Sequence, residues 1–480
     1  MDKIVLHGKE KELFENLIQY NSEKNINATL RVAGGWVRDK VMGFDATDID
    51  IAIDRISGTQ FANGFLKHLR SKRENVHGFH VIPYNHEKAK HLETACMVYH
   101  GYRIDFVSLR SEEYANTRIP VVKIGTPEED TFRRDLTINA LFYNINTAQI
   151  EDYTGKGLSD IRARVVRTPM EPKKTFQDDP LRILRALRFA ARLKFSIAPE
   201  IHEALEERAL GYRLREIVSR ERIGQEIKKI FESREYGVAV EAMIRYRLME
   251  IVFTRAEIEE PERVLRYIGS QREVLEKEEE KKAREIYHGV PKEDRHIVAL
   301  FSVLQCTLRS GRVGKVSAGA WTAQSDLRMT KAERGKIEKI SADLVFLSDE
   351  ISKRYAGVEA EEKKLCLIGI ARRMKNEMHA VFSIYLLVLK SQRGAKKEIL
   401  NEIPVVEIYD GIVENGYTDA WKEKCPVDPR EIQAHLKISG SRIKECAERL
   451  TEIGILHKTK DKASLLDCLE KRDRKDGVEE

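Results

Sequence analysis

Short segments in which apolar and polar residues alternate occur over about the first 150 residues, and this pattern predicts β-strands. The clearest strand is 48–53, Asp-Ile-Asp-Ile-Ala-Ile, in which Asp48 and Asp50 share one face and the isoleucines face a core. The other predicted strands are 27–33, 95–99, 103–107 and 140–144. Helical runs, including 58–70 and 132–140, lie between them, so we expect a mixed α/β domain with a small sheet.

The pattern changes beyond about residue 152, where a helical period dominates to the end and strand signals nearly vanish. The densely charged segment 270–287 predicts an exposed or bridging helix, because opposite charges stand three and four residues apart. Residues 428–469 predict two amphipathic helices and a short terminal helix. No fixed-period repeat is present, which argues against a solenoid.

The composition is that of a globular, multidomain chain of 480 residues, 42% hydrophobic and 34% charged. The longest apolar run, 381–389, is far shorter than the roughly 20 residues that span a bilayer, so no membrane segment is expected. The first residues resemble neither a secretory signal nor an Arg-rich presequence. Six scattered cysteines suggest a reducing compartment, and a net charge of +6 permits a nucleic-acid partner without requiring one.

A glycine pair, Gly34 and Gly35, follows the first predicted strand and precedes a predicted helix at 36–42. The N-terminus of such a helix offers free N–H groups to a phosphate, and Arg38 in its first turn can reach the same oxygens. A glycine pair alone more often marks a turn. The two carboxylates of Asp48 and Asp50 that follow change this interpretation.

Asp48 and Asp50 repel each other unless a cation neutralises them, and Mg²⁺ prefers such oxygen ligands together with substrate phosphates. The two motifs therefore predict a metal-dependent phosphoryl or nucleotidyl transferase. Asp105, on a later predicted strand, supplies a third carboxylate. It could join the metal cluster, act as a base for an attacking hydroxyl, or form a structural salt bridge.

The segment 133–140 places Arg133, Arg134 and Asp135 in one predicted helical turn, with apolar residues on the other face. The arginines can bind a triphosphate, and the aspartate can accept a hydrogen bond from a ribose hydroxyl. Alone, this pattern would indicate a solvated helix face. Beside the first motif it favours a nucleotide site.

A second basic helix is predicted after Asp178 and Asp179, either of which can cap it, with Pro180 in its first turn. Its four arginines fall within about 120° of one another on a helix of 100° per residue. They are Arg182, Arg185, Arg188 and Arg192. A solvated face normally mixes Lys with Glu, so an arginine stripe favours ligand contact. Asp179 and Arg182 together offer the acceptors and donors that reading a base edge requires.

In this order, the motifs resemble those of the tRNA nucleotidyltransferase (CCA-adding) family, in the class shared by bacteria and eukaryotes. The matching segments are 34–50, 133–140, 152–160 and 178–188. Segments 91–95, 104–107, 167–169 and 218–223 resemble a eukaryotic member. The resemblance covers roughly residues 30 to 230, and the remainder matches only in being helical and of suitable length. Asp178 departs from the pattern, since bacterial relatives often carry Glu there.

The resemblance implies an α+β fold: a polymerase-β-like nucleotidyltransferase head with a small mixed sheet, followed by an all-α neck, body and tail. The implied bounds are 1–153 for the head, 154–235 for the base-reading neck, 236–395 for the body and 396–480 for a tRNA-binding tail. It also implies that Asp48 and Asp50 hold Mg²⁺, with Asp105 as a further catalytic candidate. The implied nucleotide-binding residues are Gly34, Gly35, Arg38, Arg134, Asp135, Asn139, Asp179, Arg182, Arg185 and Arg188.

The implied reaction adds C, C and A to the 3′ end of tRNA from CTP and ATP. The helical part would contact the acceptor and TΨC side of the tRNA, and a hinge near 153–155 would let the head move. A CC-only or A-only enzyme or a poly(A) polymerase shares the head motifs. A catalytically inactive RNA-binding protein and a small-substrate nucleotidyltransferase are further alternatives. We expect a cytoplasmic or nuclear protein, with a mitochondrial pool left open.

Overall fold

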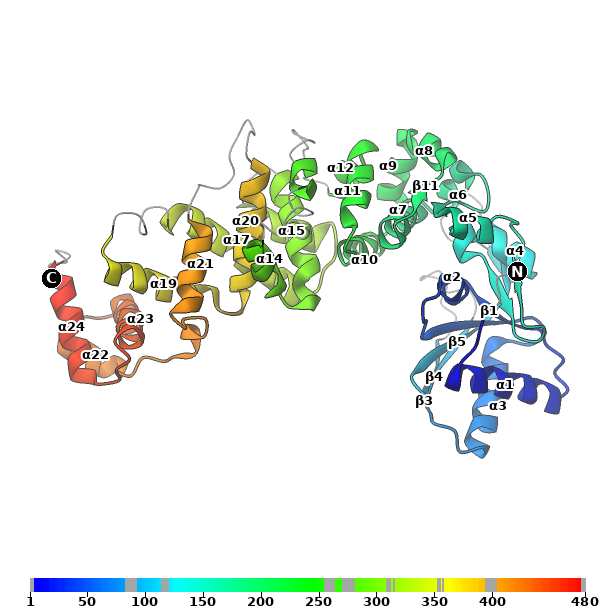
Figure 1. The fold of residues 1–480 in the computed structure, drawn as a ribbon, viewed down its shortest axis with the longest axis horizontal. Helices are drawn as coiled ribbons and strands as arrows, with labels where there is room; N and C mark the ends of the chain where they lie inside the picture. The colour runs from blue at the N-terminus through cyan, green and yellow to red at the C-terminus, as the bar shows by residue number, and fades with distance from the viewer. Residues whose placement is uncertain are drawn as a thin grey trace. The chain divides into compact units, whose positions relative to one another are not determined.

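The computed structural model divides the chain into two compact units, Met1–Val252 and Phe253–Glu480 (Figure 1). The structure describes residues 4–82, 93–113, 121–253, 264–269, 281–307, 312–313, 316–351, 355, 358–392 and 404–475. His91 and Leu92, which contribute to the resemblance, lie outside these ranges. The finer division into head, neck, body and tail stays a prediction.

A seven-stranded mixed sheet forms the centre of the first unit. Its strand order is β3 (Val76–Ile82), β4 (Thr94–Tyr99), β5 (Tyr102–Ser108), β2 (Asp48–Ile53), β1 (Leu30–Ala33), β8 (Phe142–Asn144) and β9 (Gln149–Glu151). Strands β2 and β5 are parallel, and the other neighbouring pairs are antiparallel. All five predicted strands are present, whereas the sequence pattern does not predict β3 or β9. A separate hairpin pairs β6 (Arg110–Glu113) with β7 (Val121–Ile124).

Helix α3 (Gly58–Ser71), predicted from its apolar period, packs on β4 and β5. The Phe61 and Phe65 rings lie 6.0 and 6.1 Å from the ring of Phe106 in β5. The helix approaches the strand closely at Gly58, where a Cβ atom would lie 2.7 Å from the carbonyl oxygen of Phe106. This packing holds β5, the strand that carries Asp105, against the core.

The predicted helix at 132–140 is wrong. Helix α4 (Pro127–Phe132) ends at the first residue of that segment, and a 3₁₀ turn follows at Thr137–Asn139. A capping box between Thr126 and Glu129 starts the helix earlier than expected. Leu136 is extended, with its N–H donated to the carboxylate of Asp135 over 2.9 Å, so the chain turns here instead of continuing as a helix.

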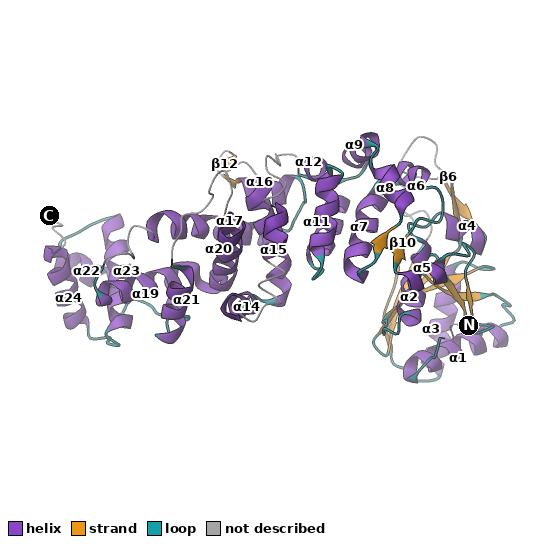
Figure 2. Ribbon diagram, turned by 45° about the horizontal axis from the view of Figure 1, so that its top comes forward, coloured by secondary structure: helices purple, strands orange, loops and turns teal. Residues whose placement is uncertain are grey.

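Helices form the rest of the first unit (Figure 2). They are α1 (Gly8–Glu23), α2 (Gly35–Val41), α5 (Gly157–Ala163), α6 (Pro172–Asp178), α7 (Leu181–Leu193), α8 (Pro199–Leu205), α9 (Arg208–Ile217), α10 (Arg220–Phe231), α11 (Tyr236–Arg245) and α12 (Leu248–Val252). A short parallel pair joins β10 (Val165–Val166) to β11 (Ser196–Ile197). Helix α7 packs against α10 and α11, so its apolar side is covered.

The start of α7 differs from the prediction. Asp178 belongs to the end of α6, and Pro180 stands at the N-cap position of α7 instead of inside its first turn. Asp179 does support the helix start, because its Oδ1 accepts a hydrogen bond from the Leu181 N–H over 3.1 Å.

The second unit is helical around one main apolar core. Its helices are α14 (Lys281–His288), α15 (Arg295–Thr307), α16 (Ala318–Ser325), α17 (Lys331–Val345), α19 (Ala360–Met374), α20 (Met378–Gln392), α21 (Val405–Glu414), α22 (Pro429–Leu436), α23 (Ser441–Leu456) and α24 (Lys462–Lys475). The charged helix expected at 270–287 is described only from residue 281 onward. The three C-terminal helices are present, the last longer than expected. No helix in the described ranges is long and apolar enough to cross a membrane.

Candidate active site

A cavity of about 750 Å³ opens in the first unit, between strands β1, β2 and β5 of the sheet and helices α7 and α10. Most of the predicted site residues line it: Gly34, Gly35, Arg38, Asp50, Arg134, Asp135, Asn139, Asp179, Arg182 and Arg185. Asp48, Asp105 and Arg188 are not among its lining residues. Residues up to 150 positions apart in the sequence therefore meet in one cavity of nucleotide size.

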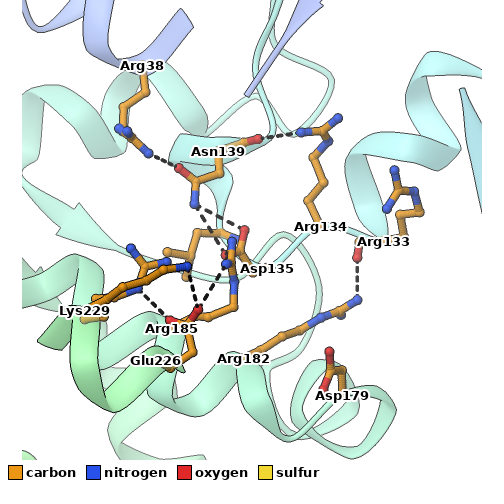
Figure 3. A network of polar contacts seen from close by, with 12 residues as sticks. Arg38, Arg133, Arg134, Asp135, Asn139, Asp179, Arg182, Arg185, Glu226 and Lys229 are labelled. Carbon is orange, nitrogen blue, oxygen red and sulfur yellow. Dashed lines mark hydrogen bonds and ion pairs between the residues drawn. The ribbon is translucent and has the colours of Figure 1, made fainter. Parts of the chain in front are cut away.

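The strand-to-helix turn after β1 forms one wall. Gly34 has φ +71°, and a Cβ atom there would lie 2.9 Å from Nη1 of Arg134. Arg38, in α2, is only 3% exposed and donates to Oδ1 of Asp39 over 2.8 Å and to Oδ1 of Asn139 over 2.5 Å (Figure 3). Burial lowers the pKa of Arg38, while the Asp39 carboxylate opposes that shift. The glycine thus lets Arg134 approach the start of α2, the helix that carries Arg38.

The carboxylates of the sheet lie side by side. Asp50 of β2 is the direct neighbour of Asp105 of β5. Burial by the surrounding protein raises the pKa of Asp50, and the charge of Asp105 raises it further against Arg134. The Asp50 side chain still reaches solvent within the cavity. Oδ1 of Asp105 is buried without a hydrogen-bond partner and lies 3.6 Å from Nε of Arg103.

This carboxylate arrangement fits a divalent cation, because a positive charge would relieve the repulsion at Asp50 and would find oxygen ligands there. No group of three or more His, Cys, Asp or Glu side chains in the described ranges is placed to hold a metal ion. That Asp48 and Asp50 are the protein's ligands to such a cation stays a prediction. Asp105 remains a candidate ligand, base or structural partner.

Two arginines after α4 are held by one carboxylate that the sequence analysis did not single out. Asp130 is 2% exposed and accepts from Nε of Arg133 and from Nε of Arg134, both over 2.9 Å. Burial alone would raise the pKa of Asp130, but Arg134 and Arg133 outweigh it, so the pKa is lowered. The spacing of three and four residues from a helical Asp could have revealed the pair in the sequence.

Asp135 and Asn139 form the polar floor of the cavity. Asn139 donates to Oδ1 of Asp135 over 3.2 Å, and Nη2 of Arg185 in α7 lies 2.6 Å from Oδ2 of Asp135. Burial would raise the pKa of Asp135, but Arg185 and Asn139 reverse this, and the pKa is lowered. The loop after α4 is thereby tied to α7 by a charged hydrogen bond.

Three arginines of α7 have partners within the protein, and Figure 3 labels two of them, Arg182 and Arg185. Arg182 donates from Nη2 to the backbone oxygen of Arg133 over 2.6 Å. Arg188 faces α10, where its Nε lies 2.6 Å from Oε2 of the buried Glu226. Burial lowers the pKa of Arg188, against the charge of Glu226. Of the four arginines of the expected stripe, Arg182, Arg185 and Arg192 line the cavity and Arg188 does not, and ligand contact by the stripe stays a prediction.

Asp179, the other predicted base reader, is paired with Arg222 of α10, whose Nη2 lies 2.8 Å from its Oδ2. Neither Arg222 nor Glu226 was predicted as a site residue. Both lie in a helix whose sequence is simply amphipathic. Their partners are 43 and 38 positions away, so the local sequence pattern does not predict either ion pair.

Neighbouring carboxylates on a sheet, a glycine turn and an arginine-lined cavity are the features expected of a polymerase-β-like nucleotidyltransferase head. Residues 30–167 match the family model described as the poly A polymerase head domain, and 194–259 match the model for the probable RNA- and SrmB-binding site of polymerase A. The predicted fold class is confirmed.

Among known proteins, the chain is 46% identical over 230 residues to the mitochondrial CCA tRNA nucleotidyltransferase of Saccharomyces cerevisiae, over 47% of this chain and 42% of that one. It is 34% identical over 213 residues to the CCA-adding enzyme of Bacillus licheniformis, over 44% and 48% of the two chains. These alignments span about half the length of the curated relatives. The predicted resemblance to the CCA-adding family, with a eukaryote-like member, is confirmed.

A solved structure of a CCA-adding enzyme without ligand superposes with a TM-score of 0.68 at 20% identity, over 97% of this chain and 96% of that one. At this identity the likeness shows the fold alone. It extends to the helical second half, for which the sequence motifs gave no information.

Proposed function

We propose that this chain adds C, C and A to the 3′ end of tRNA from CTP and ATP, releasing pyrophosphate and using no nucleic-acid template. The observation that carries the proposal is the single cavity in which Asp50, the arginines and the Asp179–Arg182 pair converge. The relatives named above act, by their names, on tRNA or in CCA addition. A deep cationic cavity beside a carboxylate pair suits transfer of a nucleotide to a hydroxyl.

In the proposed reaction, the 3′ hydroxyl of tRNA attacks the α-phosphorus and pyrophosphate leaves. Asp48 and Asp50 would hold Mg²⁺, which lowers the barrier by stabilising charge on the attacking and leaving oxygens. Arg38 and Arg134 would neutralise the triphosphate with charge-assisted hydrogen bonds. The carboxylate of Asp135, fixed by Arg185, would accept from a ribose hydroxyl.

Asp179 and Arg182 would select the base. Cytosine and adenine both present an amino group next to a ring nitrogen acceptor, whereas uracil and guanine present an oxygen next to an N–H group. An aspartate that accepts from the amino group and an arginine that donates to the ring nitrogen therefore fit C and A and reject U and G. In the structure these side chains contact Arg222 and the backbone oxygen of Arg133, and each has further acceptor or donor capacity for a base.

The helices beyond residue 154 would contact the acceptor and TΨC side of tRNA through shape and phosphate contacts. The proposed neck, body and tail are 154–235, 236–395 and 396–480. We also propose a cytoplasmic or nuclear location, with a mitochondrial pool left open, since relatives in Saccharomyces cerevisiae and Candida glabrata are named as mitochondrial. Fractionation of cells that express a tagged full-length chain tests this part.

The activity is tested with tRNA that lacks its CCA end and with radiolabelled nucleotides supplied singly and together. CTP alone should add two residues, and CTP with ATP should add three and then stop. Addition that stops at CC, addition of A only to tRNA ending in CC, or a long A tail would instead identify the partial enzymes or a poly(A) polymerase. Tight tRNA binding without any incorporation would identify an inactive RNA-binding protein.

A further inference from the structure

Phe189 occupies an unexpected place on α7. Counting from Arg182, residues 185, 189 and 192 fall within about 80° of one face, and all four line the cavity. The other three are arginines, so a phenylalanine stands in the middle of a cationic stripe. It is only 6% exposed.

The ring of Phe189 is shared by three guanidinium groups. The Cζ atoms of Arg188, Arg38 and Arg185 lie 4.2, 5.1 and 5.6 Å from its centroid. These distances are within the reach of cation–π attraction, in which the negative face of the ring stabilises a cation. Two of the arginines come from α7, but Arg38 comes from α2 at the glycine turn.

The ring of Phe189 is part of a closed chain of contacts between side chains. Arg38 donates to Asn139, Asn139 donates to Asp135, and Asp135 accepts from Arg185. Arg185 and Arg38 then meet again on Phe189. These contacts connect the wall proposed to bind the triphosphate with helix α7. Arg182, the proposed base reader, lies two turns before Phe189 in that helix.

We propose that Phe189 is a positioning residue that couples the triphosphate end of the cavity to its base-reading end through the guanidinium group of Arg38. An anion that binds Arg38 moves or fixes the guanidinium group of that residue. Because the Phe189 ring also contacts Arg185, the change in position of Arg38 is passed on to Arg185 and α7. The inference rests on the proposed function, because it assigns the two ends to the two parts of one nucleotide.

The coupling is measured by binding, without catalysis. The affinity of the full-length chain for cytidine is determined by calorimetry with and without inorganic tripolyphosphate. Coupling between two sites is reciprocal, so tripolyphosphate should raise cytidine affinity, and cytidine should raise tripolyphosphate affinity by the same factor. Cation–π contacts of this kind correspond to a factor of about 2 to 30.

Two changes at Phe189 separate the ring's charge distribution from its packing. Phe189→Leu keeps an apolar side chain without a π face, and a trifluorinated phenylalanine keeps the shape with a weaker negative face. Both should reduce the coupling factor toward one. Phe176→Leu in α6 is the matched control, because Phe176 is fully buried and no cation over its ring is found in the described part of the chain. It should leave the factor unchanged.

The outcomes distinguish the two proposals. The proposed coupling role of the Phe189 ring is overturned if the trifluorinated protein keeps the coupling factor of the wild type. It is also overturned if the wild-type protein binds the two ligands independently. In both cases the proposed function stands. Failure of the wild-type chain to bind either ligand would remove the proposed function and this inference together.

Discussion

At the scale of single residues, the cavity is organised by carboxylates that are already paired with arginines. Asp130, Asp135, Asp179 and Glu226 each contact at least one guanidinium group. Asp50 differs from them, because no hydrogen bond or ion pair of its side chain is found among the described residues, and its pKa is raised by burial and by Asp105. An ionised carboxylate without a partner lowers the stability of the fold unless a cation binds to it.

Asp50→Asn should therefore stabilise the metal-free fold while it abolishes activity. A carboxylate whose pKa is raised by folding opposes folding once the pH exceeds its ordinary range. The variant's gain in thermal midpoint should thus be absent in acid and grow toward neutral pH. Incorporation should fall more than about a hundredfold. The control Asp45→Asn, at a fully exposed position, should change neither quantity.

Arg182→Ala should impair nucleotide choice more than tRNA binding. Removing one charge-assisted hydrogen bond to the base corresponds to about 1.5–3 kcal/mol, or roughly 10- to 150-fold in the preference for CTP over UTP. Competition between the two nucleotides in the incorporation assay gives this ratio, and filter binding gives the tRNA affinity. The base-reading role would be lost if the variant kept wild-type fidelity.

At the scale of helices and strands, two short connecting segments determine where the charged side chains of the cavity lie. The turn from β1 to α2 lets Arg134 lie close to the backbone because Gly34 lacks a side chain. The break between α4 and the 3₁₀ turn at Thr137–Asn139 lets Asp135 point toward α7. In a continuous helix over 132–140, the direction of the Asp135 carboxylate would instead be set by its position on the helix face.

Gly34→Ala should weaken nucleotide binding through the clash of its Cβ atom with Arg134. Gly43→Ala is the matched control, because Gly43 also has positive φ, +80°, but no atom lies within 4 Å of a Cβ built there. Both variants should lose stability from backbone strain, and Gly34→Ala should lose more, because Gly34 has ψ −117° and lies outside the left-handed helical region. The affinity for CTP, measured by calorimetry, should fall only for Gly34→Ala. Equal affinities in the two variants would contradict the proposed phosphate turn.

Asp130→Asn should weaken CTP and ATP binding by similar factors, because it releases Arg133 and Arg134, which serve the part that both nucleotides share. Loss of charge-assisted hydrogen bonds of this kind corresponds to about 1.5–3 kcal/mol. The preference for CTP over UTP should stay unchanged, in contrast to Arg182→Ala. Steady-state KM values measure both effects. Glu128→Gln, exposed on the same helix, is the control, and a selective effect on one nucleotide would exclude the common role.

At the scale of the whole molecule, the cavity and all its lining residues belong to the first compact unit, Met1–Val252. Residues 1–252 alone should therefore bind CTP with nearly the affinity of the full chain. Their affinity for tRNA should fall more than about tenfold, because phosphate contacts of the remaining helices are lost. Gel-shift titration at fixed salt measures the difference. Unchanged tRNA affinity would remove the proposed role of the helices beyond the first unit.

The sequence by itself determined the strand 48–53, the glycine turn and the helical character of the second half. These features depend on side-chain alternation, backbone freedom and apolar period, which act over a few neighbouring residues. Most of the site residues predicted from the sequence line the cavity, because the motifs that carry them are local.

Only the tertiary structure decided how those motifs pair. The contact of Asp50 with Asp105 depends on the register of two parallel strands, and those of Asp179 with Arg222 and Arg188 with Glu226 depend on the packing of α7 on α10. The shared ring of Phe189 requires α2 to meet α7. Burial and charge pairing act between residues distant in the chain, so no local pattern of amino acids encodes them.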